Sequence, residues 1–391
     1  MPLKHRPRST FTERPLRVLV LLNSPAHDWL GQELLTALKK QQPRAVFFGM
    51  GGAGMRHLGL NPLPTLPLEV NFQALRGIHK GNVLRNLYYN KRLLATQCGE
   101  KNIDVVITIG PAPLFAPLVK NLCRRYGVPC YHYGQTHQPV FPPAASLKPY
   151  SHIFCFYPAE AEDIREKGLD ATFVGHPILA HFAAYIPTGE SKPLSSPRKI
   201  ALMPGQRGAV VKQVMPAMAS MAQNIKENHP QGCDVVLPLA GTTNPRHFEA
   251  YSTLQATYAR GEEKHKALSA CDAALALAGE DNLHLALFGV PMVVVRPPGI
   301  AQRLSALRSR PNRGFTSPVN SLLGEQAVPE VSCGDGEAIA AQIQPLLENT
   351  PQRRQQLAAF HKVRRALRPP DGQSVPDKAA EILLSSLLSK I

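Results

Sequence analysis

Short apolar runs alternate with segments of helical periodicity along nearly the whole chain, and this alternation constrains the fold more than any other feature. The run Leu16–Leu22 has the leucine and valine content of a strand buried on both faces of a sheet. The segment 210–226 instead repeats apolar residues at helical spacing. Such alternation predicts an α/β fold with parallel, doubly wound sheets. The expected strands cover residues 16–22, 45–49, 103–109, 129–133, 152–156, 171–174, 200–203, 235–239, 273–277 and 291–295, and the expected helices cover 29–38, 115–125, 159–167, 210–226, 267–271 and 283–288.

A segment rich in proline, serine and glycine at residues 186–198 interrupts the alternation, which restarts at Lys199. This composition is typical of a boundary between domains. We therefore expect an N-terminal domain at residues 1–185 and a C-terminal domain at residues 199–365, with a ligand in the cleft between them at the C-terminal ends of the strands. The remaining residues, 366–391, contain a leucine-rich helix that either packs back on the first domain or covers the second.

The stretch 199–208 reads as one phosphate-binding unit. The apolar run Ile200–Met203 ends abruptly at Pro204-Gly205, which predicts a buried strand followed by a tight turn. Gly205 can take a positive φ and leaves backbone amides uncovered. The first amides of the following helix have no partners within the helix, and the guanidinium of Arg207 could hold two phosphate oxygens. An ordinary loop with a solvated arginine is the plain alternative.

The charge of the chain favours an anionic partner. There are 44 Lys and Arg against 28 Asp and Glu, which gives a formal net charge of +16. Nucleic acid, a phosphorylated ligand and an acidic membrane face would each suit this excess. The sequence holds no basic nucleic-acid motif with interleaved aromatics, so we expect no nucleic-acid partner.

Cysteine usage and hydropathy indicate a reducing compartment and no membrane span. The seven cysteines are odd in number and scattered, and none forms a C-x-x-C pair, which argues against a disulfide framework and against a zinc site. No apolar run approaches the length of a membrane span, and the first one lacks the cleavage site of a signal peptide. We expect a protein that is soluble or lies on a membrane surface.

Several short segments along the chain form a recognisable series when they are taken in order. They are Phe48–Met55, His132-Tyr133, Phe173–Pro177, Leu202–Arg207, Asp272–Leu275, Pro291–Val294 and Asn320–Leu323. Each segment is short, and the specificity lies in their shared order. Together they resemble the lipid-A-disaccharide synthase family of GT-B glycosyltransferases over nearly the whole chain. The resemblance implies a GT-B fold, in which two Rossmann-like, doubly wound domains face a cleft.

The resemblance also implies an activity. Such enzymes join UDP-2,3-diacylglucosamine to 2,3-diacylglucosamine 1-phosphate in lipid A biosynthesis, inverting the donor carbon and using no metal and no cofactor. The UDP-sugar donor would bind the C-terminal domain, and the acylated sugar phosphate acceptor would bind the N-terminal one. The expected donor-binding residues are Gly205, Gln206, Arg207, Gly279, Asp281, Asn282, His284 and Asn320.

A location follows from the same resemblance. The enzyme would be cytoplasmic and peripheral on the inner face of the cell membrane, where an anionic bilayer surface attracts a basic protein. The arginine-rich segment 303–313 is one candidate for the membrane-facing surface. A merely solvated arginine-rich segment is the alternative.

The chain departs from the family at positions where chemistry is expected. The aspartate thought to be catalytic, after the strand 103–109, is Gly110 here, and the glutamate expected to hold the donor ribose is His284. His284 would either bond a sugar hydroxyl or cap its helix. An inverting transfer needs a general base near the acceptor hydroxyl. The loop candidates that remain are His27, Asp28 and His137.

Each of these candidates also has a structural interpretation. Asp28 could orient the imidazole of His27 as a catalytic dyad, or it could simply cap the helix that begins at Trp29. His137 could be an ordinary loop histidine.

Three functions therefore stay open. The first is an active lipid A transferase with changed chemistry at the acceptor. The second is a GT-B protein that binds a nucleotide sugar or glycolipid without turnover. The third is a UDP-sugar transferase or epimerase with another substrate.

Overall fold

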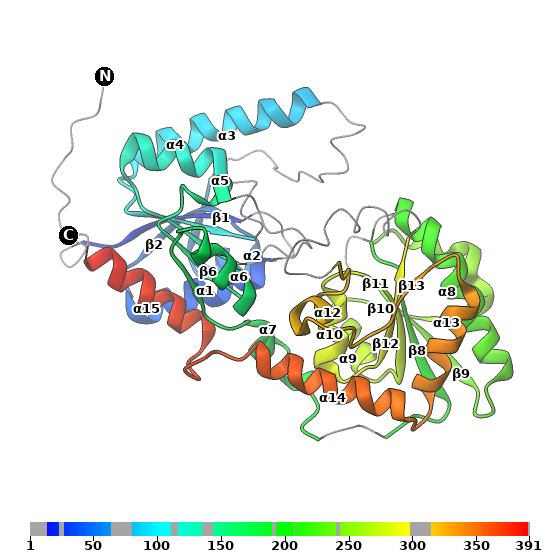
Figure 1. Cartoon of the computed structure of the whole chain (residues 1–391). Coiled ribbons are helices and arrows are strands. Elements are labelled where there is room, and N and C mark those ends of the chain that lie inside the picture. Colours follow the sequence, from blue (N-terminus) through cyan, green and yellow to red (C-terminus); the bar gives the residue numbers. More distant parts are fainter. Residues whose placement is uncertain are drawn as a thin grey trace. The chain divides into compact units, whose positions relative to one another are not determined.

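The computed structural model describes residues 14–22, 27–63, 80–110, 116–134, 144–189, 193–206, 208–239, 243–297 and 314–389. These residues form two compact units (Figure 1). Unit 1 comprises the described residues up to Pro177 together with those from Arg368 onward, and unit 2 comprises those from Ile178 to Leu367. Each unit contains one parallel sheet with helices between its strands, which confirms the predicted α/β fold.

The sheet of unit 1 has the order β3-β2-β1-β4-β5-β6-β7, and its neighbouring strands run parallel. The strand β1 lies in the interior of this sheet, between β2 and β4, and its Val18 and Val20 face one hydrophobic core while Leu19 and Leu21 face the other. All four side chains are fully buried, as expected for a strand covered on both faces. The strands are β1 (Arg17–Leu22), β2 (Val46–Met50), β3 (Leu60–Pro62), β4 (Val105–Ile109), β5 (Cys130–Tyr133), β6 (His152–Cys155) and β7 (Ala171–Phe173).

Helices cover both faces of this sheet. The helices α1 and α15 share one core with β1, whereas α3 and α4 contribute to the core on the opposite face. The last helix, α15, lies beside α1 (Figure 1), and Ser386 accepts a hydrogen bond of 2.9 Å from the hydroxyl of Tyr131. The helices of unit 1 are α1 (Asp28–Gln41), α2 (Ala53–His57), α3 (Lys80–Glu100), α4 (Ala116–Tyr126), α5 (Ala144–Leu147), α6 (Pro158–Glu166) and α15 (Val375–Leu388).

The sheet of unit 2 has the order β10-β9-β8-β11-β12-β13 and is also parallel. Ile200 and Leu202 of β8 pack with α8 and α13 in one core, and Ala201 between them is fully buried on the other face. The strands are β8 (Arg198–Met203), β9 (Cys233–Pro238), β10 (Thr257–Ala259), β11 (Ala273–Leu277), β12 (Met292–Arg296) and β13 (Glu330–Ser332).

The helices of unit 2 connect these strands and end in the long helix α14, which contacts α10 and α12. They are α7 (Ile178–His181), η4 (Ala183–Tyr185), α8 (Gly208–Asn228), η5 (Pro245–Leu254), α9 (Glu262–Ser269), α10 (Asp281–Phe288), α12 (Pro318–Leu323), α13 (Gly336–Ile343), η6 (Gln344–Leu347) and α14 (Pro351–Ala366).

The chain enters unit 2 earlier than the sequence suggests. We expected the first domain to continue to residue 185, but α7 and η4 belong to unit 2. The physical reason is an aromatic cluster: the ring of Phe182 lies 4.6 Å from that of His265 and 5.6 Å from that of Phe288. The Pro- and Ser-rich segment that we took for the boundary therefore follows the first residues of unit 2.

None of the helices in the described part of the chain is both long enough and apolar enough to cross a membrane.

Candidate functional site

The turn between β8 and α8 has the geometry expected of a phosphate-binding loop. Gly205 adopts φ +85°, and a Cβ placed there would lie 2.7 Å from Cδ2 of Leu277 at the end of β11. The backbone conformation therefore favours glycine, and a Cβ would in addition displace the terminal methyl group of Leu277. The helix α8 then begins at Gly208 and has no acidic residue in its first turn. Its first amides thus form a concentration of positive partial charge, suited to an anion.

Of the two predicted polar residues in this turn, the structure describes one. Gln206 is exposed and precedes α8. Arg207 lies outside the described residues, so its predicted contact with a diphosphate stays a prediction.

A second turn, between β11 and α10, is closed by Asn282. Its side-chain Oδ1 accepts a hydrogen bond of 3.2 Å from the amide of Gly279, and its Nδ2 donates one of 3.0 Å to the carbonyl of Leu277. The side chain is fully buried. A Cβ placed at Gly279 would meet no heavy atom of the described residues within 4 Å, so a ligand can approach this backbone. Asn282 therefore shapes the turn, and Gly279 presents the open surface.

Asp281 stands at the start of α10 between the side chains of Lys264 and His284. Its Oδ1 lies 3.0 Å from Nζ of Lys264 and 3.4 Å from Nδ1 of His284. The longer contact is mainly electrostatic, because 3.4 Å exceeds the length of a strong hydrogen bond. Burial raises the pKa of Asp281, but the contact with His284 and the charge of Lys264 outweigh it and hold the pKa well below its usual range. The carboxylate is therefore ionised.

His284 is oriented by this carboxylate and by aromatic packing. Its ring lies 4.8 Å from that of Phe182 and 6.0 Å from that of His265. Burial, and then the charge of His284, lower the pKa of His265 to about 4. The N-cap residue of α10 is Glu280, whose side chain makes no capping hydrogen bond. His284 lies within the helix, and its Nδ1 is close to the side chain of Asp281. The helix-capping interpretation of His284 is thus wrong, and its contact with a sugar hydroxyl stays a prediction.

Asn320 is a buried anchor of the loop between α12 and β13. Its Nδ2 donates to the carbonyl of Val328 at 2.8 Å and to Oε1 of Glu330 at 2.9 Å, and its Oδ1 accepts from the amide of Val328 at 2.9 Å. Both of its amide hydrogens are therefore used within the loop. Glu330 also accepts from the backbone amides of Thr316 and Ser317. Asn320 and Glu330 together fix this loop beside the last two strands of the sheet.

In unit 1, Asp28 holds the glycine-rich turn after β2. Its Oδ1 accepts from the amide of Gly52 at 2.7 Å and its Oδ2 accepts from the amide of Gly54 at 2.8 Å. A Cβ at Gly52 would lie 2.4 Å from Cγ of Asp28, so the close approach needs glycine. Our expectation that Asp28 caps the helix beginning at Trp29 is wrong, because Asp28 is itself the first residue of α1 and its carboxylate binds the N-terminus of α2.

His27 is the remaining described candidate for a general base. It is half-buried at the start of α1, and its Nδ1 is buried without a hydrogen-bond partner among the described residues. Both oxygens of Asp28 are already engaged by backbone amides, so Asp28 does not serve His27 as a dedicated partner. His137 lies outside the described residues. Gly110 is fully buried at the end of β4 with φ +99°, a conformation that favours glycine.

His132 on β5 is a buried histidine to which the sequence alone assigned no structural function. His132 Nδ1 lies 2.9 Å from the hydroxyl of Thr108, and burial lowers the pKa of His132 to about 3. The ring is therefore neutral at physiological pH. Among the described residues, no group of three or more His, Cys, Asp or Glu side chains is arranged to hold a metal ion.

Solved structures share this architecture. The UDP-GlcNAc 2-epimerase of Neisseria meningitidis, solved with UDP-GlcNAc, matches with a TM-score of 0.62 at 12% identity over 96% of this chain and 100% of that one. MurG of Acinetobacter baumannii matches with a TM-score of 0.59 at 14% identity over 95% and 100%. At such identities the likeness is one of fold. Two units with parallel, doubly wound sheets, together with this likeness, define the GT-B fold, as predicted.

Sequence relatives narrow this class to a family. The family model described as lipid-A-disaccharide synthetase matches residues 18–382. The lipid-A-disaccharide synthase of Pseudomonas aeruginosa strain UCBPP-PA14 is 30% identical over 94% of this chain and 97% of its own length, and that of Gluconobacter oxydans strain 621H is 29% identical over 96% and 92%. The chain belongs to the lipid-A-disaccharide synthetase family. The predicted family and the predicted class of enzyme, a hexosyltransferase of lipid A biosynthesis, are thereby confirmed.

Proposed function

We propose that this chain transfers an acylated glucosaminyl group from UDP-2,3-diacylglucosamine to 2,3-diacylglucosamine 1-phosphate, with inversion and without a metal. Unit 2 binds the UDP-sugar donor, and unit 1 binds the acylated sugar phosphate acceptor. The observation that carries the proposal is the turn between β8 and α8. Gly205 adopts a positive φ there and has no side chain to cover the backbone amides, and the first turn of α8 has no acidic residue. The family membership supports the choice of substrates.

The reaction places its largest change of charge on the leaving diphosphate. The acceptor hydroxyl oxygen forms a bond to the anomeric carbon of the donor while the bond from that carbon to the β-phosphate oxygen breaks, and UDP leaves. Amides at the start of α8 and the guanidinium of Arg207 stabilise the negative charge that develops there. The open backbone at Gly279 lies beside this turn, since β8 and β11 are neighbouring strands, and accommodates the rest of the nucleotide.

The proton of the acceptor hydroxyl goes to a base in unit 1. We assign this function to His27, whose buried Nδ1 has no hydrogen-bond partner among the described residues. An imidazole titrates near physiological pH and suits general-base catalysis. His137 is the competing candidate, and Asp28 is a positioning residue because its carboxylate fixes the turn at Gly52 and Gly54.

The proposed location is the inner face of the cell membrane, with the protein bound peripherally. Both substrates carry acyl chains, so they reside in or on a bilayer. The formal net charge of +16 favours attraction to an anionic lipid surface.

Two measurements on the wild-type protein test this function. UDP at about 100 times its dissociation constant should stabilise the fold by roughly 2.7 kcal/mol, seen as a rise in melting temperature. The purified protein should also form the tetraacyl disaccharide phosphate and release UDP. Arg207→Ala should abolish the shift with UDP, whereas Arg260→Ala, an exposed arginine elsewhere in unit 2, should leave it unchanged.

The outcomes separate the competing functions. A shift with UDP but no transfer product would favour binding without turnover, for which the glycine at position 110 is the structural argument. Turnover of UDP-N-acetylglucosamine without transfer to a lipid A precursor would favour an epimerase. If transfer is found, His27→Ala should lower turnover by about 10²–10⁴-fold, and an unaffected rate would move the base to His137.

A further inference from the structure

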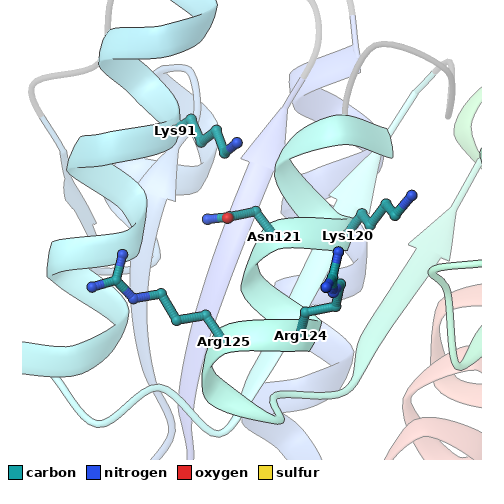
Figure 2. A pocket seen from close by; sticks show the side chains of 5 residues that line it. All are labelled: Lys91, Lys120, Asn121, Arg124 and Arg125. Atoms are coloured by element: carbon teal, nitrogen blue, oxygen red, sulfur yellow. The ribbon is translucent and has the colours of Figure 1, made fainter. Parts of the chain in front are cut away.

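The helices α3 and α4 of unit 1 enclose an open cleft of about 450 Å³ whose lining is almost wholly cationic. Figure 2 shows Lys91 extending from α3 toward α4, and Asn121 and Arg125 extending from α4 toward α3. Lys120 and Arg124 complete the lining from α4. Among the described residues, no acidic side chain lines the cleft.

The positive charge of this cleft is not compensated by the described part of the protein. All four cations are exposed, and none of them forms an ion pair within the described residues. The sequence of α4 contains no acidic residue, and the sequence of α3 contains only Glu100, which accepts a hydrogen bond of 3.1 Å from Gln97. Like charges gathered on one surface repel each other and produce a strong local potential. Such a surface is suited to a ligand with more than one negative oxygen.

The cleft is held by packed helices. Leu94 and Cys98 on α3, and Leu118 and Leu122 on α4, are buried in the core beneath the sheet face. The backbones that carry the cations are therefore fixed. The charged groups therefore stay gathered over one surface, where several of them can contact the oxygens of one phosphate.

Two exposed tyrosines, Tyr88 and Tyr89, precede Lys91 on α3. The exposed fraction of Tyr88 is 67% and that of Tyr89 is 44%. Tyr88 and Lys91 are three residues apart and so share one face of the helix. Tyrosine is enriched where a protein meets the boundary between lipid and water, because its ring is apolar and its hydroxyl is polar. Exposed tyrosines beside clustered cations are the arrangement expected of a surface that binds an anionic bilayer.

We propose that the α3–α4 cleft binds the phosphate of an anionic membrane lipid, with Tyr88 and Tyr89 in the interfacial layer of the bilayer. The proposal rests on the proposed function for the idea that the enzyme works at a membrane, and it identifies the surface that binds there. The cleft volume lies within the range of small-molecule sites, so it can hold a glycerophosphate headgroup rather than a phosphate alone.

The main test is flotation with vesicles, using the full-length protein without substrates. Wild-type protein should bind vesicles that contain phosphatidylglycerol far more tightly than vesicles of phosphatidylcholine alone, and rising salt should weaken this binding. The triple variant Lys120→Gln/Arg124→Gln/Arg125→Gln should bind phosphatidylglycerol vesicles about 100-fold more weakly, since each basic residue near such a surface contributes roughly fivefold.

A matched variant controls for net charge. Arg246→Gln/Arg260→Gln/Lys266→Gln removes three exposed cations from unit 2 and should leave vesicle binding close to wild type. Equal losses in the two triple variants would overturn the proposal, because they would show attraction to net charge alone. The double variant Tyr88→Ala/Tyr89→Ala should bind phosphatidylglycerol vesicles more weakly than wild type, and this difference should persist at high salt.

Wild-type footprinting removes any dependence on the folding of the variants. Phosphatidylglycerol vesicles should protect Lys91 and Lys120 from acetylation while Lys266 stays reactive, and millimolar inorganic phosphate should not reproduce the protection. If the vesicles leave Lys91 and Lys120 reactive, the proposal is contradicted. It is also contradicted if an added single-stranded RNA displaces the protein from the vesicles and itself protects these two lysines from acetylation. Since neither readout uses a sugar nucleotide, a failed transferase assay and a failed flotation assay remain distinguishable.

Discussion

Unit 1 and unit 2 each contain a glycine-rich turn that joins a strand to a helix, but the backbone amides of the two turns have different surroundings. After β2, the amides of Gly52 and Gly54 are bonded to the carboxylate of Asp28. After β8, the turn at Gly205 leads into α8, whose first turn carries no acidic residue. Helix N-termini attract anions. In unit 1 the protein supplies that anion itself, whereas in unit 2 we propose that a ligand supplies it.

A glycine-rich turn is therefore not by itself evidence of a nucleotide site. The segment 49–55 loosely resembles a dinucleotide-binding fingerprint, yet the amide of Gly52 donates a hydrogen bond to the carboxylate of Asp28 within the same unit. What distinguishes the two turns is a single carboxylate from a residue that is distant in the sequence.

The largest predicted effect comes from breaking the internal anion site. Asp28→Asn should lower the free energy of unfolding by about 2–4 kcal/mol, because hydrogen bonds to a charged group contribute about 1.5–3 kcal/mol each. Urea unfolding of the variant measures this loss. Glu162→Gln, an exposed acid on α6, should change stability by less than about 0.5 kcal/mol. A small effect of Asp28→Asn would show that the turn in unit 1 does not depend on its carboxylate.

The second prediction concerns pH and compares one histidine of lowered pKa from each unit. The pKa of His132 is lowered to about 3 and that of His265 to about 4, in both cases chiefly by burial. The unfolded chain takes up these protons near pH 6.5 whereas the folded chain does not, so stability is full above pH 6.5 and falls as the pH decreases toward the folded pKa. At pH 5 the loss is about 2 kcal/mol for His132 and less for the partly exposed His265.

Unfolding free energies measured between pH 7.5 and 5 check this prediction. His265→Gln should reduce the pH slope by up to one proton. A slope that is unchanged in the variant, or stability that rises on acidification, would contradict the assignment of a neutral His265.

Much of the fold could be predicted from sequence because the central strands are strongly apolar and the turns are punctuated. The strand 200–203, its Pro-Gly ending and the helix behind it were all predicted and are found as β8 and α8. Three of the four three-residue strands, β3, β10 and β13, were not predicted, because so few residues carry little periodicity. The fourth, β7, was predicted at residues 171–174. The helix α3 was missed, and among those of its residues whose burial the structure describes, Leu94, Ala95 and Cys98 reach the core.

The candidate site was less predictable for a different reason. Asp28 contacts Gly52 and Gly54 across more than twenty residues of sequence, and Asn320 contacts Val328 and Glu330 across a loop. Such pairings follow from tertiary structure and leave no local pattern. The cationic cleft leaves no local pattern in the sequence either. Its two helices, α3 and α4, lie side by side because of the order of the strands in the sheet, which the sequence does not show directly.

The third prediction tests the turn in unit 2. Gly205→Ala should destabilise the fold by about 1–3 kcal/mol, because alanine at positive φ is strained and its Cβ would contact Leu277. It should also abolish the melting shift with UDP. Gly279→Ala has open space at its Cβ and should leave stability within about 0.5 kcal/mol while weakening UDP binding. Equal loss of stability in the two variants would mean that Gly205 is not specifically required.

The smallest predicted effect is that of the ion pair at α10. Lys264→Gln should lower the free energy of unfolding by less than about 1 kcal/mol, since the side chain of Asp281 is 30% exposed and solvent screens the pair. Removing the positive charge should raise the pKa of Asp281, which NMR titration of its carboxyl carbon can follow. A larger loss of stability would indicate that the pair has a structural function beyond orienting the carboxylate.

Amide hydrogen exchange in the presence of UDP tests the contrast between the two turns most directly. We predict slower exchange at the start of α8, in peptides that cover residues 204–211, and no change at residues 51–57, where Asp28 already binds the amides. Protection at residues 51–57, or exchange at the start of α8 that UDP does not alter, would contradict this contrast.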